Sequence, residues 1–307
     1  MVILPSGRDY RSPNRQHDRQ FFYKYVTSAV AKIAIATRKL RWSSPILFND
    51  PFDVTQELRV DFDAPELSAA MTNRVASLME QGDFTNSIGH PMLAYLLRIV
   101  SRTAPDVRRE VAAELRQDVT TTDGQIEAFS ALQDMWTSMV PTFRILCVSE
   151  LPDVTPMWLH YAAKYTGVVL EFSSVDELDS AFLAARPVIY QDTPPAIADV
   201  DTWVNCLLGK GLDYETLFTE SQYIKTTAWS YEKEWRIVSG NRPGESGLFA
   251  DYGFHPRELT GIYFGPKCST ADREDLLALR TYGLEHVRAY EAAGDRIQAK
   301  FTFVAIE

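Results

Sequence analysis

Long apolar runs and paired cysteines are both absent from this 307-residue sequence. No stretch reaches about twenty apolar residues, the length that a membrane-spanning helix needs. The first twenty residues, MVILPSGRDYRSPNRQHDRQ, lack the basic start and apolar core of a signal peptide. Cys147, Cys206 and Cys268 are far apart and form no Cys-x-x-Cys motif. We therefore expect a soluble, cytoplasmic protein with reduced thiols and no membrane contact.

Positive charge is scarce relative to negative charge. The chain has 31 Lys and Arg against 41 Asp and Glu, a formal net charge of -10. Nonspecific binding to nucleic acid needs a field of basic side chains. Bulk nucleic-acid binding is therefore not expected.

The best-known enzyme motifs are missing as well. The sequence contains no G-x-G-x-x-G, no G-K-[ST] of a phosphate-binding loop, no H-E-x-x-H and no G-x-S-x-G. These absences remove the main support for a dinucleotide-binding Rossmann fold, a P-loop enzyme, a zinc protease and a serine hydrolase. The remaining candidates for chemistry are short clusters of polar and aromatic residues.

The pattern of apolar residues predicts an α+β protein with a helical insertion. Residues 21–64 begin with a strand, a helix and a second strand, and β-rich segments return in residues 139–307. Between them, residues 65–138 have apolar positions at intervals of three and four, which predicts about four helices. Residues 1–20 are polar and are expected to form a flexible leader. The helical insertion offers a surface for a protein partner.

The segment TTAWSYEKEWRIVSG, residues 226–240, places two glutamates two positions apart. On a strand, Glu232 and Glu234 would lie on the same face and repel each other unless a cation such as Lys225 or Arg236 compensates them. Taken alone, the pair is more typical of a solvated strand edge than of a site. The density of aromatic residues around it favours a site.

Three further clusters precede this segment. FYKYV contains Lys24 and Tyr25 on the first predicted strand, FNDPFD contains Asn49 in a predicted turn, and MWLHYA contains His160 and Tyr161 before a central strand. Each also has a structural interpretation: aromatic core residues, a capped turn, or a hydrogen-bonded histidine.

In order, these clusters resemble a bacterial family called domain of unknown function 2971. The matching segments are FYKYV (22–26), LRWSSPILFNDPFD (40–53), LCVSE followed by MWLHYAAKYTGVVLEF (157–172), KTTAWSYEKEWRIV (225–238) and IYFGPKCS (262–269). The family name implies no activity.

A looser resemblance is to the ADP-ribosyltransferases. Their sites run from an Arg or His on the first strand, through a Ser-Thr-Ser or Tyr motif on a middle strand, to a late glutamate in E-x-E or Q-x-E. Here Lys24 or Tyr25 takes the first position, where those enzymes have Arg or His. This resemblance implies a mixed or antiparallel β core of the ADP-ribosyltransferase-like fold, with NAD as substrate and an unidentified acceptor, and a toxin or defence role.

The same resemblance implies roles for individual residues. Glu234 would stabilise the oxocarbenium-like state of NAD cleavage, and Glu232 would orient or deprotonate the acceptor. His160 is the third expected catalytic residue. The residues expected to bind NAD are Lys24, Tyr25, Asn49, Trp158, Tyr161 and Arg236.

Two other functions remain open from the sequence. In a metal-dependent nuclease or hydrolase, Asp50, His160, Glu232 and Glu234 would converge on magnesium or manganese. In a non-catalytic sensor or interaction module, the same motifs would serve the core.

Overall fold

The chain forms two compact units, which we call the sheet unit and the helical unit. The sheet unit comprises residues 1–55, 140–193 and 222–307, and the helical unit comprises residues 56–139 and 194–221. The computed structural model describes residues 10–54, 59–82, 91–117, 130, 133–193, 196, 199–210, 220–281, 283–295 and 300–306.

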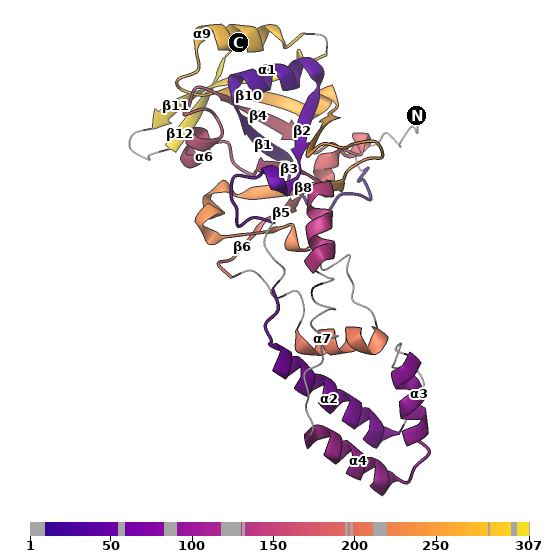
Figure 1. Cartoon of the computed structure of the whole chain (residues 1–307). Helices are drawn as coiled ribbons and strands as arrows, with labels where there is room; N and C mark the ends of the chain where they lie inside the picture. Colours follow the sequence, from indigo (N-terminus) through magenta and orange to yellow (C-terminus); the bar gives the residue numbers. More distant parts are fainter. Residues whose placement is uncertain are drawn as a thin grey trace. The chain divides into compact units, whose positions relative to one another are not determined.

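The sheet unit is built on a mixed sheet, which confirms the α+β class. Its ten strands, counted over the described residues, run in the order β12-β11-β10-β4-β1-β3-β2-β9, with β8 and β5 joined through β3 (Figure 1). All pairs in this sheet are antiparallel except β10 with β11. The strands are β1 (Phe21–Val26), β2 (Lys39–Ser43), β3 (Phe143–Ser149), β4 (Val168–Ser173), β5 (Arg186–Pro187), β8 (Glu234–Gly240), β9 (Phe249–Gly253), β10 (Leu259–Phe264), β11 (Arg288–Asp295) and β12 (Lys300–Ile306). A separate pair, β6 (Ile189–Tyr190) and β7 (Ile224–Lys225), is parallel.

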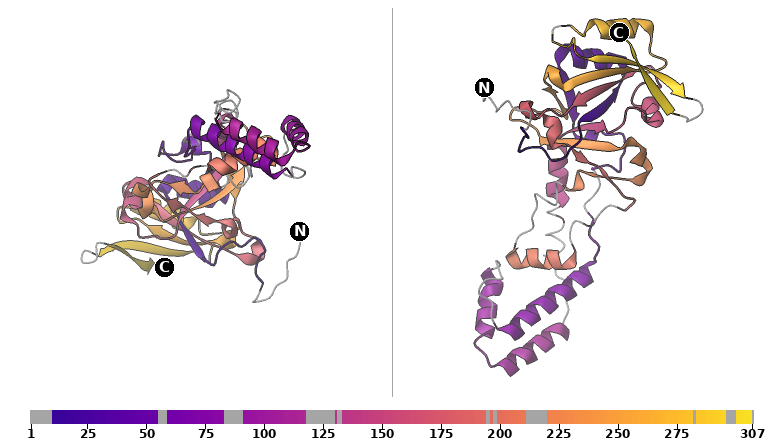
Figure 2. Two further views of the ribbon diagram at one scale, coloured as in Figure 1. Left: turned by 90° about the horizontal axis from the view of Figure 1, so that it is seen from below. Right: turned by 180° about the vertical axis from the view of Figure 1, so that it is seen from behind.

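Two helices of the sheet unit, α1 (Ser28–Thr37) and α9 (Thr270–Ala278), lie together on one side of this sheet (Figures 1 and 2). Lys32 on α1 joins them, since its Nζ lies 2.8 Å from Asp272 and 2.6 Å from Asp275. The apolar side chains of α1, β1, β4 and β10 form one buried core, including Phe22, Leu170 and Ile262. The continuous apolar runs of these strands follow from their burial.

Strand β3 has one fully paired edge and one divided edge. Its whole length pairs with β8, whereas the opposite edge meets β1 at Ser149 and β2 at Ile145. Four residues of strand span roughly 13 Å, so β1 and β2 meet β3 at separate points. Between them, Lys24 Nζ donates a hydrogen bond to the carbonyl oxygen of Cys147 at 2.7 Å. The divided edge leaves room for a pocket whose floor is β3.

The helical unit contains α2 (Ala64–Gln81), α3 (Pro91–Val100), α4 (Pro105–Gln117) and α7 (Val200–Asn205). A reciprocal capping box between Asp63 and Glu66 begins α2, and Arg116 on α4 binds the carboxylate of Glu80 on α2 at 2.6 and 3.0 Å. We expected an insertion of residues 65–138; the unit also includes residues 194–221, because α7 packs on α2. The fourth expected helix lies partly outside the described residues.

The expected flexible leader is only partly within the described residues, which begin at Tyr10. Residues after this point are held on the sheet unit, contrary to the expectation. The Arg15 guanidinium contacts Asp176 at 2.9 and 2.7 Å, and Ser12 Oγ donates to Asp179 at 2.6 Å. Throughout the described part of the chain, no helix combines the length and apolarity that a membrane crossing requires.

Candidate functional site

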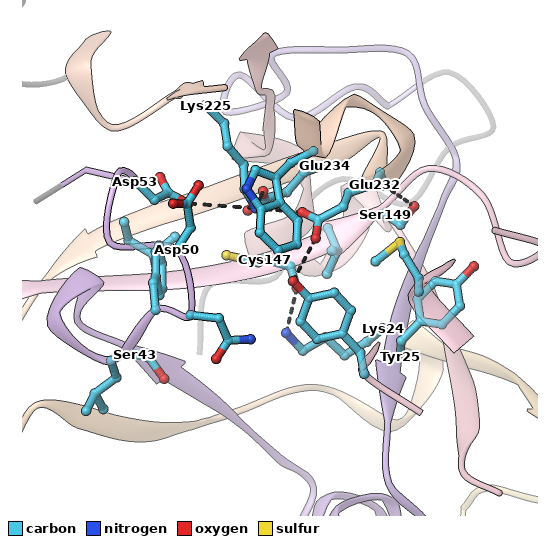
Figure 3. Close-up of a pocket in the computed structure, with 18 of the residues that line it drawn as sticks. Lys24, Tyr25, Ser43, Asp50, Asp53, Cys147, Ser149, Lys225, Glu232 and Glu234 are labelled. Atoms are coloured by element: carbon cyan, nitrogen blue, oxygen red, sulfur yellow. Dashed lines mark hydrogen bonds and ion pairs between the residues drawn. The ribbon is translucent and has the colours of Figure 1, made fainter. Parts of the chain in front are cut away.

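A pocket with about 880 Å³ of empty space, including its open mouth, lies against the divided edge of β3 (Figure 3). Its walls come from β1, β2, the loop after β2, helix α6 (Thr155–His160) and the 3-10 helix η6 (Thr227–Glu232). The polar and aromatic residues that line it are Tyr23, Lys24, Tyr25, Arg41, Ser43, Phe48, Asn49, Asp50, Asp53, Cys147, Ser149, Tyr161, Lys225, Trp229, Glu232 and Glu234.

The two glutamates enter this pocket from a turn rather than from one strand. Glu232 ends η6, Lys233 adopts a left-handed conformation with φ of 47°, and β8 begins at Glu234. The prediction that both lie on a strand is therefore wrong, because the 3-10 helix extends to the first of them. The alternative of a solvated edge is also wrong: Glu232 is 2% exposed and Glu234 is 5% exposed.

Two cations compensate the buried carboxylates, as the sequence spacing required. Lys225 Nζ lies 2.6 Å from Glu232 and 3.0 Å from Glu234. Arg236 Nε donates to Glu234 at 2.8 Å, and its Nη2 donates to Asp53 at 2.6 Å. We call these five residues, Asp53, Lys225, Glu232, Glu234 and Arg236, the charged cluster.

The charged cluster moves the proton affinities of its two glutamates in opposite directions. Burial opposes ionisation of Glu234, but attraction to Arg236 and Lys225 outweighs it and holds the pKa of Glu234 below its usual value. Burial raises the pKa of Glu232 above its usual value, despite the opposing attraction of Lys225. Glu234 is thus a fixed negative charge, and Glu232 is the member better suited to exchange a proton.

Aromatic side chains cover this end of the pocket. The hydroxyl of Tyr161 donates to Glu232 Oε1 at 2.7 Å, and the Trp229 ring centroid lies 5.0 Å from Lys225 Nζ. Burial and the neighbouring Glu232 carboxylate raise the pKa of the Tyr161 hydroxyl, which therefore stays protonated as a donor. Both rings remain available to a ligand, because Tyr161 and Trp229 also line the pocket.

Strand β1 and the loop after β2 supply the opposite walls. Lys24 and Tyr25 both line the pocket, but the hydroxyl of Tyr25 is engaged, since it donates to the Leu151 carbonyl at 2.8 Å and accepts from Val154 N at 3.1 Å. Asn49 is exposed and also lines the pocket. The structure thus gathers Lys24, Tyr25, Asn49, Tyr161, Glu232 and Glu234 around one space.

Three other expected site residues do not line the pocket. Trp158 is fully buried in a core cluster beneath it, with its ring 5.5 Å from that of Tyr25. Arg236 is fully buried behind Glu234. His160 is exposed and is the last residue of α6; the backbone then leaves the helical conformation, with positive φ at residues 163–165. The prediction of a cleft shared with His160 is therefore corrected.

Sequence reasoning did not assign Asp53 or Trp229 to the site, and it named Asp50 only as a metal ligand and Lys225 only as a compensating cation. Their signal was present, since FNDPFD and KTTAWSYEKEW were among the segments singled out. The sequence does not show that Asp53 binds the guanidinium of Arg236, because the two residues are 183 positions apart.

The described residues contain no group of three or more His, Cys, Asp and Glu side chains placed to hold a metal ion. The four residues expected to converge in a metal-dependent hydrolase do not do so. His160 lies outside the pocket, and both glutamates already bind Lys225.

One comparison with known proteins gives a match around this site. Residues 157–237, which include Tyr161, Lys225 and both glutamates of the pocket, match the model of a family described as "Protein of unknown function (DUF2971)". The resemblance to that family is thereby confirmed. No curated protein and no solved structure matches the chain.

Proposed function

We propose that this protein cleaves the bond between a nucleoside sugar and its base, with NAD as the substrate. The description of DUF2971 names no activity, so the proposal is argued from the pocket. The observation that carries the proposal is a pair of buried glutamates whose pKa values are moved apart by a shared lysine, at the end of an aromatic pocket. Cleavage of this kind needs both a fixed negative charge and a proton-exchanging group.

Each glutamate has a role that follows from its surroundings. Positive charge develops on the sugar as the bond to nicotinamide breaks, and the ionised Glu234 stabilises it electrostatically. Glu232, with its raised pKa, accepts the proton of the attacking water or acceptor. The Tyr161 hydroxyl holds Glu232 in place, and the rings of Tyr161 and Trp229 pack on the leaving base.

The order β1, α1, β2 at the start of the sheet unit supports the finer proposal of an ADP-ribosyltransferase-like fold. In that case the products are nicotinamide and either free ADP-ribose or an ADP-ribosylated acceptor. Lys24 supplies positive charge for the phosphates of the substrate. A toxin or defence role is the corresponding biological proposal.

The test is to incubate the protein with NAD and to quantify free nicotinamide by chromatography. We expect release by the wild type and a loss of at least about a hundredfold in Glu234→Gln and Glu232→Gln, the scale of removing one electrostatic or proton-transfer group. The control is Glu258→Gln, since Glu258 is equally buried, at 5% exposed, and does not line the pocket. If wild-type protein releases no nicotinamide, labels no acceptor and shows no thermal shift with NAD, the proposal is wrong.

A further inference from the structure

Asp50 carries a buried charge that the described part of the chain does not compensate. The residue is 7% exposed and lines the pocket. Its Oδ1 accepts a hydrogen bond from the Phe52 amide at 2.9 Å, whereas Oδ2 is shielded from water and has no hydrogen-bond partner among the described residues. A buried carboxylate oxygen without a partner is unfavourable. A ligand that brings positive charge into the pocket would relieve this cost.

The two cations of the charged cluster are already paired with carboxylates. Lys225 and Arg236 serve the three carboxylates of the charged cluster, which leaves one negative charge over when all five groups are ionised. Lys24 donates to a main-chain carbonyl of β3, and Arg41 pairs at 3.1 Å with a carboxylate on the surface. The carbonyl does not neutralise Lys24, so the charge of Lys24 offsets this excess, and with Asp50 also ionised one net negative charge remains among these groups.

The pocket also has surfaces that attract cations. The faces of tyrosine and tryptophan rings carry negative electrostatic potential, and Tyr161 and Trp229 both line the space that Asp50 lines. Aromatic rings combined with an uncompensated carboxylate form the usual setting for a positive organic group that cannot itself donate a hydrogen bond.

We infer that the pocket selects a ligand with a positively charged organic group, a pyridinium or a quaternary ammonium, and that Asp50 sets this preference. The inference rests on the proposed function for the identity of the group, since the nicotinamide ring of oxidised NAD is a pyridinium cation. The selection is electrostatic, so a ligand of the same shape without the charge binds more weakly.

The test compares cations with neutral partners of similar shape, using the full chain and isothermal titration calorimetry. The first pair is oxidised and reduced NAD; the second is choline and 3,3-dimethylbutan-1-ol. We expect wild-type protein to bind the cation of at least one pair about tenfold more tightly, which equals about 1.4 kcal/mol. Asp50→Asn removes this preference while the neutral compound keeps its affinity. The matched control Asp201→Asn, an exposed residue of α7, keeps the preference.

The outcomes separate this inference from the proposed function. A preference for cations that Asp50→Asn abolishes, without nicotinamide release by the wild type, supports the inference and removes the proposed reaction. If the wild type releases nicotinamide but prefers the cation in neither pair, the proposed reaction is supported and the inference about Asp50 is wrong. Circular dichroism checks that Asp50→Asn is folded. A folded Asp50→Asn variant that still prefers the cation overturns the inference. A wild type that binds neither cation also overturns it.

Discussion

Replacing Lys225 by methionine is the sharpest test of the charged cluster. The side chain is 7% exposed, and its Nζ contacts Glu232 at 2.6 Å, Glu234 at 3.0 Å and Asp53 at 3.7 Å. Methionine keeps most of the volume and removes the charge. Arg236 is then the one cation of the charged cluster that still compensates its three buried carboxylates. Removing one partner of a buried ion pair lowers the free energy of unfolding by about 3–5 kcal/mol. For a unit of this size, that corresponds to a fall of roughly 6–20 °C in Tm.

The loss in Lys225→Met depends on pH in a defined direction. Burial already raises the pKa of Glu232, and removing the lysine that opposes this effect raises it further. The folded variant then binds a proton on Glu232 more strongly than the unfolded chain does. The loss of stability is therefore small at a pH below the pKa of Glu232 in both states, and it grows as pH rises through the pKa of Glu232 in the folded state. The difference in Tm from the wild type should therefore be larger at pH 8 than at pH 5.

Thermal unfolding followed by tryptophan fluorescence at several pH values measures both effects. The control is Lys39→Met, since Lys39 is exposed on β2 and its replacement should leave Tm almost unchanged. The double variant Lys225→Met with Glu232→Gln should recover part of the lost stability, because one of the uncompensated charges is gone. A loss below about 1 kcal/mol that does not vary with pH would refute this account of the charged cluster.

Two further perturbations test the geometry around the pocket. Tyr161→Phe removes the 2.7 Å hydrogen bond that favours ionised Glu232, so the pKa of Glu232 should rise further. Any activity that needs ionised Glu232 should then shift to higher pH. An unchanged pH profile would contradict the assigned contact. Gly265→Ala places a Cβ 2.3 Å from the carbonyl oxygen of Tyr165 and should lower Tm by several degrees or prevent folding, whereas Gly240→Ala, with nothing within 4 Å, should have little effect in the same thermal melt.

Much of the sheet unit was predictable because its strands are marked by continuous apolar or β-branched runs. The segments FFYKYV, FRILCVS and LTGIYF lie in the regions expected to be β-rich, and each becomes a strand. The misses occur where non-glycine residues adopt positive φ, at Lys233 before β8 and at residues 163–165 after α6. Side-chain preferences do not reveal these positions, since the surrounding structure imposes them.

The candidate site was predictable in composition but not in arrangement. Mutual repulsion of Glu232 and Glu234 required a nearby cation, and the structure provides Lys225 and Arg236. The exposure of His160 depends on where α6 stops. The burial of the whole cluster depends on a loop more than 170 residues earlier, whose Asp53 binds Arg236 at a separation of 183 residues. No local pattern carries such information.

The divided edge of β3 has a consequence for folding. Residues 21–54, 143–149 and 225–234 must all come together before the pocket exists, and contacts so distant along the chain form slowly because each closes a long loop. A fragment limited to residues 157–237 would keep both glutamates, Lys225 and Arg236, yet lack the strand that forms the floor. Such a fragment would leave four charged side chains in water, where the opposite pKa shifts of the two glutamates would vanish.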